Sequence, residues 1–179
     1  MDLYFIRHAA AVELDREISE DSFRYLSPEG RAHSAEIAQK LHKLNINFDL
    51  ILSSPIVRAI QTAEIFSNIM HHKGDFKTAV ELIGGSSFNR FQQLLHRSSN
   101  YKSIACFGHS PDMNQYSINL IKENRVKELK VNFKNCSVCR IKYDYEKDKG
   151  SFVWFLKSDT LELVHPSKED KILTGIKNY

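Results

Sequence analysis

The stretch LYFIRH at residues 3–8 opens the chain with four apolar residues, followed at once by an arginine and a histidine. A short apolar run of this kind predicts a buried strand. The stretch SPEG at residues 27–30 predicts the start of a helix, with a serine cap and a proline in the first turn. Ile37, Leu41 and Leu44 give that helix one apolar stripe. Together these signals form a first strand-to-helix step.

The strand-to-helix step repeats along the first two thirds of the chain. LIL at residues 50–52 predicts a second buried strand, and SSPIVR at 53–58 predicts a helix that a serine can cap and whose first turn holds the proline. We expect further strands and helices at residues 78–82, 88–95, 103–107 and 110–121, in alternation. Three later strands follow one another without a helix, at residues 131–133, 138–143 and 152–156. An antiparallel edge is therefore expected there.

Strands that alternate with helices predict an α/β fold. Its central sheet should be mostly parallel with an antiparallel edge, and helices on both faces make a three-layer α/β/α sandwich. A chain of 179 residues with 42% apolar residues can bury one such core. We expect a single domain over residues 1–164 and a loosely held C-terminal tail over 165–179, where the sequence is polar.

The charge and hydropathy of the chain argue against two classes of partner. Lys and Arg number 25 against 22 Asp and Glu, and a formal net charge of +3 is too small to indicate nucleic-acid binding. No apolar run approaches the roughly 20 residues that a membrane helix needs, and no basic region precedes the first strand. We therefore expect a cytoplasmic protein that binds neither nucleic acid nor membrane.

The spacing of Cys136 and Cys139 invites a metal or redox interpretation, with Cys106 as a third thiol. Their neighbours are typical of a strand, however, and positions three apart on a strand point to opposite faces. We expect free, partly buried thiols in a reducing compartment, with no metal site and no cofactor.

Charged and titratable residues follow three of the predicted strands. Arg7 and His8 follow the first strand, Arg58 lies about one turn into the helix after the second, and His109 follows a glycine after the strand at 103–107. Carboxyl ends of parallel strands meet at one edge of a sheet, so these four side chains are expected to converge. Guanidinium groups beside a helix start suit an anion such as a phosphoryl group. Each motif alone has a plainer interpretation, as a surface pair or an ordinary capped helix, but their coincidence favours a site.

Three stretches together resemble the histidine phosphatase superfamily, whose fold is also called phosphoglycerate mutase-like. They are FIRH at 5–8, LSSPIVRAIQTA at 52–63 and FGHSPD at 107–112. More narrowly, the short chain with LSPEGR at 26–31 and WFL at 154–156 is similar to phosphohistidine phosphatases of the SixA type.

This resemblance implies that His8 is the nucleophile that takes up the phosphoryl group, with Arg7, Arg58 and His109 as the catalytic and substrate-binding residues around it. A neutral imidazole that holds its Nδ1–H against a backbone carbonyl leaves Nε2 free to attack phosphorus. Positive charge around the equatorial oxygens then stabilises the transition state. Water hydrolyses the phosphohistidine afterwards, and this scheme requires no metal.

The chain departs from the family pattern at two places. Ala9 stands where the family usually has glycine, which adds strain of about 1 kcal/mol if that backbone requires a positive φ. The nearest candidate for the general acid of larger relatives is Glu81, but its segment lacks the fuller acid motif, and a glutamate at a strand end is usually solvated. Members of the SixA type manage without such an acid, and His109 can supply a proton instead.

Three functions are compatible with these residues. The first is a protein phosphohistidine phosphatase, favoured because the short chain has no insertion that would form a lid over a small substrate. The second is a phosphomonoesterase for a small metabolite, with Glu81 or His109 as the acid. The third is a phosphate-recognition module without turnover, which Ala9 suggests. The partner is accordingly a phosphorylated protein or a small phosphate substrate.

Overall fold

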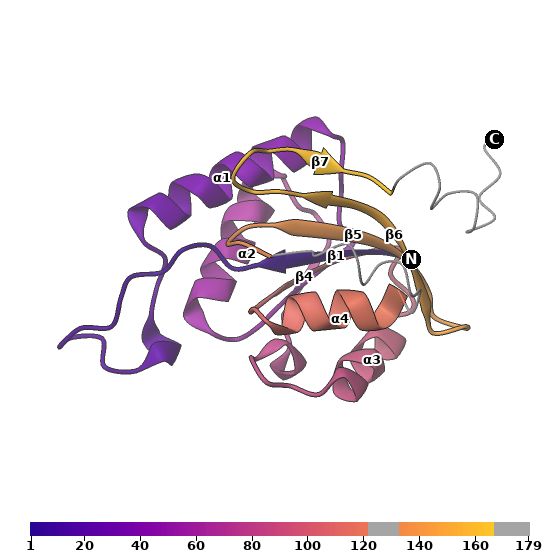
Figure 1. The fold of residues 1–179 in the computed structure, drawn as a ribbon, viewed down its shortest axis with the longest axis horizontal. Helices are drawn as coiled ribbons and strands as arrows, with labels where there is room; N and C mark the ends of the chain where they lie inside the picture. The colour runs from indigo at the N-terminus through magenta and orange to yellow at the C-terminus, as the bar shows by residue number, and fades with distance from the viewer. Residues whose placement is uncertain (122–132, 167–179) are drawn as a thin grey trace.

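The centre of the fold is a twisted sheet in a computed structural model that describes residues 1–121 and 133–166 (Figure 1). Within these residues the strand order is β3-β2-β4-β1-β5-β6-β7. The strands are β1 (Asp2–Arg7), β2 (Leu50–Ser53), β3 (Asp75–Thr78), β4 (Ser103–Gly108), β5 (Val138–Asp144), β6 (Lys149–Leu156) and β7 (Leu163–Val164). The first four pair in parallel, and β5 to β7 pair antiparallel. The predicted parallel sheet with an antiparallel edge is confirmed.

Helices cover both faces of this sheet. They are α1 (Pro28–Lys43), α2 (Val57–Ile69), α3 (Phe88–Arg97) and α4 (Asp112–Ile121), with short 3-10 turns η1 (Asp21–Phe23) and η2 (Val80–Leu82). Figure 1 shows α1 and α2 on one side of the sheet and α3 and α4 on the other. Alternate residues of β1 point to the two layers, because Leu3 and Phe5 belong to the core under α3 and α4, whereas Tyr4 and Ile6 belong to the other core. The three-layer arrangement is the predicted one.

The start of α1 fixes the loop that follows β1. Ser27 caps the helix by accepting a hydrogen bond from the Gly30 amide at 3.1 Å, as expected from the sequence. Gly30 itself packs against the backbone of Ala10, and a Cβ at this position would lie only 2.0 Å from the Ala10 carbonyl oxygen. Glycine is therefore required here, so that helix and loop can approach this closely.

Two element boundaries differ from those expected. The third strand ends at Thr78, and residues 80–82 of the predicted strand form the turn η2. All four residues of β3 are exposed, so this strand carries no apolar pattern that sequence analysis could detect. The helix expected from Ser54 begins only at Val57, and no side chain caps it.

The cysteines are buried and free, as expected. Cys136 lies in a turn with a φ of 62° rather than in a strand, because β5 begins two residues later. Cys136 and Cys139 nevertheless contribute to opposite cores. Two parts of the chain predicted above, most of the strand at 131–133 and residues 167–179 of the tail, lie outside the described residues.

The helices contain no membrane-spanning candidate: in residues 1–121 and 133–166 none combines the length and the apolar character that crossing a bilayer requires.

Candidate active site

The loops after β1, β2 and β4 are joined by backbone hydrogen bonds at the carboxyl edge of the sheet. Arg7 pairs in register with Gly108, the last residue of β4, and the His8 amide donates to the Gly108 carbonyl at 3.0 Å. The Ser54 amide donates to the Phe107 carbonyl at 2.9 Å. The three sequence motifs that carry arginine and histidine therefore share one small region.

His8 presents an unprotonated Nε2 in this region. Its Nδ1 lies 2.7 Å from the carbonyl oxygen of Ala9, which can only accept, so Nδ1 carries the proton. Its Nε2 lies 3.2 Å from Arg58 Nε. Because an arginine N–H can only donate, Nε2 is the acceptor and carries no proton. Burial, opposed by the Ala9 hydrogen bond and aided by His109, Arg58 and Arg7, lowers the pKa of His8 to about 3. The ring is neutral at physiological pH.

His109 faces His8 across the site. The two ring centroids are 5.0 Å apart, and His109 Nε2 lies 2.9 Å from the hydroxyl of Ser54. Burial lowers the pKa of His109 to about 4, with Arg58 and Arg7 acting in the same direction and Asp21 opposing them. Ser54 thus orients an imidazole at the site instead of capping α2.

Arg58, the second residue of α2, makes contact with two other parts of the site. Besides His8, it binds Asp21, with Nη1 donating to the backbone carbonyl at 2.6 Å and Nη2 to the carboxylate at 2.7 Å. Its own carbonyl accepts from the Thr62 hydroxyl at 2.7 Å, and that hydroxyl accepts from the Ala9 amide at 3.1 Å. The loop after His8 is thereby tied to the first two turns of α2.

Arg7 completes the group of four predicted residues. Its Nη1 donates to the Phe133 carbonyl at 2.8 Å, and burial lowers its pKa. Its Nε is buried without a hydrogen-bond partner among the residues that the structure describes. A buried guanidinium N–H without an acceptor is costly unless a ligand oxygen satisfies it.

The two departures from the family pattern have different outcomes. Ala9 is fully buried, and its φ is not positive, so alanine brings no left-handed strain to this loop. Glu81 lies in η2, where its carboxylate accepts a hydrogen bond from Arg97 Nη2 at 2.6 Å. This glutamate is therefore paired with the end of α3, and within the described residues it makes no hydrogen bond to the four residues above.

Asp21 is the residue at the site that sequence reasoning missed. It lies in η1, within the irregular segment between β1 and α1 that extends beyond the sheet edge in Figure 1. An aspartate in a polar loop is ordinarily solvated, and its partner Arg58 is 37 residues away, so the sequence offers no local signal for the contact.

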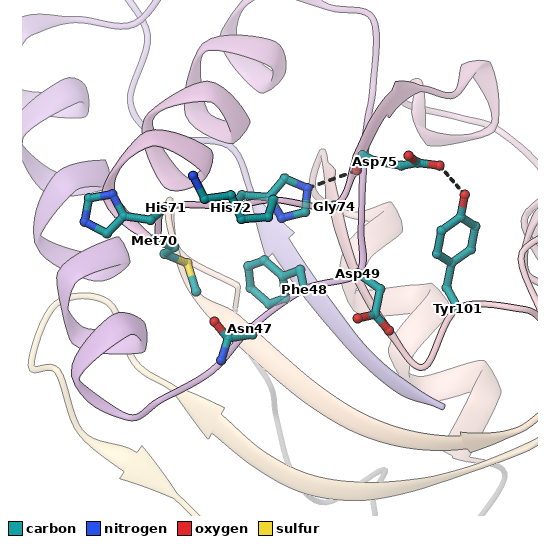
Figure 2. A pocket seen from close by; sticks show the side chains of 10 residues that line it. Asn47, Phe48, Asp49, Met70, His71, His72, Gly74, Asp75 and Tyr101 are labelled. Carbon is teal, nitrogen blue, oxygen red and sulfur yellow. Dashed lines mark hydrogen bonds between the residues drawn. The ribbon is translucent and has the colours of Figure 1, made fainter.

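A separate cavity of about 420 Å³ lies at the opposite, amino edge of β2 and β3 (Figure 2). Several of its polar side chains take part in local hydrogen bonds. Asp49 accepts from the Lys102 and Ser103 amides at 2.8 and 3.0 Å, Tyr101 donates to Asp75, and His72 Nε2 lies 3.1 Å from the Asp75 carbonyl oxygen. In the described part of the chain no three His, Cys, Asp or Glu side chains form a group that could hold a metal ion. The carboxyl edge of the sheet, where the loops after β1, β2 and β4 meet, is therefore the better candidate for the active site.

Comparisons with known proteins bear on the family and the fold. Residues 3–79 match the model of the histidine phosphatase superfamily, branch 1. An uncharacterised protein of Picosynechococcus sp. is 32% identical over 121 residues, which cover 65% of this chain and 71% of that protein.

Solved structures share the fold. A protein histidine phosphatase SixA complexed with tungstate has a TM-score of 0.80 at 22% identity, covering 90% of this chain and 100% of that one. A SixA phosphohistidine phosphatase from Agrobacterium tumefaciens, described as putative, has a TM-score of 0.75 at 22% identity, covering 87% and 97% of the two chains. A mycobacterial glucosyl-3-phosphoglycerate phosphatase has a TM-score of 0.64 at 15% identity, covering 84% and 96%. The fold and the family expected from the sequence are confirmed, and the chain belongs to the histidine phosphatase superfamily.

Proposed function

We propose that this chain is a protein phosphohistidine phosphatase in which His8 takes up the phosphoryl group. Membership of the histidine phosphatase superfamily supports the reaction class. The observation that carries the proposal is the state of His8, whose Nδ1–H is held by the Ala9 carbonyl at 2.7 Å while Nε2 keeps its lone pair within a buried, cationic region. This is the form that a nitrogen nucleophile needs.

The proposed reaction has two steps. His8 Nε2 attacks phosphorus and forms a P–N bond, while the bond to the leaving nitrogen breaks and its electron pair stays with that nitrogen, which takes up a proton. Water then attacks the phosphohistidine and passes one proton to His109, the P–Nε2 bond breaks with its electron pair staying on Nε2, and inorganic phosphate and neutral His8 result. Arg7 and Arg58 stabilise the charge on the equatorial oxygens in both steps.

His109 is the proposed proton source. Burial and the two arginines keep its pKa at about 4, so the ring is neutral before a substrate binds. A bound phosphoryl group brings negative charge close to the ring and favours the protonated form. The Ser54 hydroxyl, 2.9 Å from Nε2, keeps the ring oriented in either state.

A phosphohistidine substrate is supported over a phosphate ester by the position of Glu81. An ester needs a proton donor for its alkoxide, whereas a protonated imidazole leaves readily. The carboxylate of Glu81 accepts a hydrogen bond from Arg97 at 2.6 Å, and within the described residues it makes no hydrogen bond to His8, Arg7, Arg58 or His109, so it is not placed to serve an ester as proton donor. The higher TM-scores of the SixA structures compared with the mycobacterial phosphatase are in keeping with this choice.

Competition between substrates tests the proposal. A phosphohistidine-bearing protein and a panel of sugar, nucleotide and aryl phosphates are offered to the wild type and to His8→Ala, with His42→Ala on the exposed side of α1 as a matched control. We expect the phosphoprotein to have the highest kcat/KM, and only His8→Ala to lose activity. Faster turnover of a sugar or nucleotide phosphate would overturn the substrate assignment.

Glu81→Gln separates the two enzymatic interpretations. We expect kcat with an aryl phosphate to change less than about threefold, because the carboxylate already serves Arg97. The measurement is a steady-state assay at neutral pH. A loss of two or more orders of magnitude would instead identify Glu81 as the general acid of an ester phosphatase.

A further inference from the structure

The segment between β1 and α1 brings Asp21 to the rim of the site, where Arg58 binds it. The backbone carbonyl and the carboxylate of Asp21 accept from Nη1 and Nη2 at 2.6 and 2.7 Å, while Nε of the same guanidinium donates to His8 at 3.2 Å. Three of the five N–H donors of Arg58 thus have acceptors. Both terminal nitrogens are bound to Asp21, and the Nε edge faces the proposed nucleophile.

The carboxylate of Asp21 is also held from its other side. Arg24 Nη1 donates to Oδ1 at 3.0 Å, and Arg24 Nε donates to the Val12 carbonyl at 2.6 Å. The carboxylate therefore bridges two guanidinium groups. Hydrogen bonds from Arg58 and then Arg24 lower the pKa of Asp21, so it is ionised at neutral pH.

We propose that Asp21 is a positioning residue for Arg58, whose guanidinium it holds so that the Nε edge is presented to a phosphoryl group beside His8. This inference rests on the proposed function. Asp21, an exposed loop residue, would then act on the reaction through Arg58, without touching the substrate itself.

Two opposing effects decide the sign of the contribution. A carboxylate at the rim repels an anionic substrate, but the side chain of Asp21 is 58% exposed, so water and salt screen that repulsion. The side chain of Arg58 is only 10% exposed, so its bond to the carboxylate is little screened by water, and loss of that bond removes one of the three hydrogen bonds that orient the guanidinium. Orientation therefore outweighs repulsion, and removal of Asp21 should weaken phosphate binding.

Calorimetric titration with inorganic phosphate tests this sign. We expect Asp21→Ala to weaken phosphate binding about tenfold, the size of one lost hydrogen bond to a charged group. Asp21→Asn keeps an acceptor oxygen and should rescue part of the loss. Glu20→Ala and Glu20→Gln remove the same charge from the same segment. Among the described residues the Glu20 carboxylate accepts a hydrogen bond only from the Ser22 hydroxyl, so these variants should bind phosphate like the wild type.

Kinetics with an aryl phosphate give a second readout. Because charge on the equatorial oxygens is best matched in the transition state, kcat should fall more than KM rises in Asp21→Ala. Circular dichroism and a melting curve check that the variants are folded. If Asp21→Ala does not fold, the comparison of Asp21→Asn with Glu20→Gln replaces it, and weaker phosphate binding by Asp21→Asn supports the proposal.

Phosphate binding by the Asp21 variants as tight as, or tighter than, that of the Glu20 variants would overturn the positioning role, because repulsion would then dominate. Weaker binding without phosphatase activity in any protein, the wild type included, would refute the proposed function and leave the role of Asp21 intact. A wild type that binds no phosphate would overturn both.

Discussion

At the scale of the residue, the protonation state of His8 follows from burial. Desolvation lowers the pKa of its imidazole to about 3, and the Ala9 carbonyl selects the tautomer in which Nδ1 carries the proton. An isolated imidazole has a pKa near 6.5 and would be partly protonated at pH 6. The folded environment therefore keeps the proposed nucleophile unprotonated over a wide range of pH.

The same burial should make the protein sensitive to acid. The unfolded chain takes up protons on His8 and His109 as the pH falls below about 6.5. The folded chain takes them up only near pH 3 for His8 and pH 4 for His109. The free energy of unfolding therefore decreases as the pH falls from about 6.5 towards these lower values. Urea unfolding from pH 7.5 to 4.5 measures this loss. We expect a shallower decrease in His8→Asn than in the wild type, with the exposed His42→Asn as control; equal slopes in all three proteins would contradict the shift.

At the scale of the element, helix α1 determines how the loop after β1 is held. Ser27 caps the helix, and Gly30 allows its first turn to touch the Ala10 backbone. The Ser27 amide also donates to the Ala10 carbonyl at 3.0 Å. The position of His8 thus depends on a helix whose own residues lie outside the site.

Gly30→Ala tests this dependence. The added methyl would meet the Ala10 carbonyl oxygen at 2.0 Å, so helix or loop must move, at a cost of about 1–3 kcal/mol in unfolding free energy. Because the loop carries the residues next to His8, kcat should fall as well. The exposed Ala32→Gly on the same helix costs about 1 kcal/mol through helix propensity and should leave kcat unchanged. Equal kcat in both variants would show that α1 does not position the site.

The elements also show how far sequence reasoning reaches. Each of the residues His8, Arg58 and His109 follows a buried strand, and apolar runs of strand length are visible in a sequence, so their convergence could be predicted. The sequence predicts Ser54 as a helix cap, yet its hydroxyl bonds to His109. The same serine hydroxyl can cap a helix or orient a site residue, so the sequence alone does not separate the two roles. Asp21 could not be found, since its contact depends on the path of an irregular loop.

At the scale of the whole molecule, the parallel strand order concentrates cationic groups at one edge of a protein whose net charge is only +3. The loops after β1, β2 and β4 meet there, while the amino edge holds the cavity shown in Figure 2. Local arrangement, and not overall charge, therefore accounts for the proposed anion site.

Phosphate should accordingly stabilise the folded molecule. A ligand that binds only the folded state adds about 2.7 kcal/mol at a concentration 100 times its Kd. Melting curves with and without inorganic phosphate measure this effect. Arg58→Ala should abolish the increase in Tm, whereas Arg97→Ala, which removes an arginine bound to Glu81 outside the site, should preserve it. A phosphate response that survives in Arg58→Ala would place the anion elsewhere.

The most direct measurement is to trap the phosphoenzyme during turnover and locate its label. A rapid acid-free quench in alkali, followed by peptide mapping, should find an alkali-stable and acid-labile phosphoryl group on His8, and none in His8→Ala. A label on Ser53 or Ser54, or continued turnover by His8→Ala, would contradict the account.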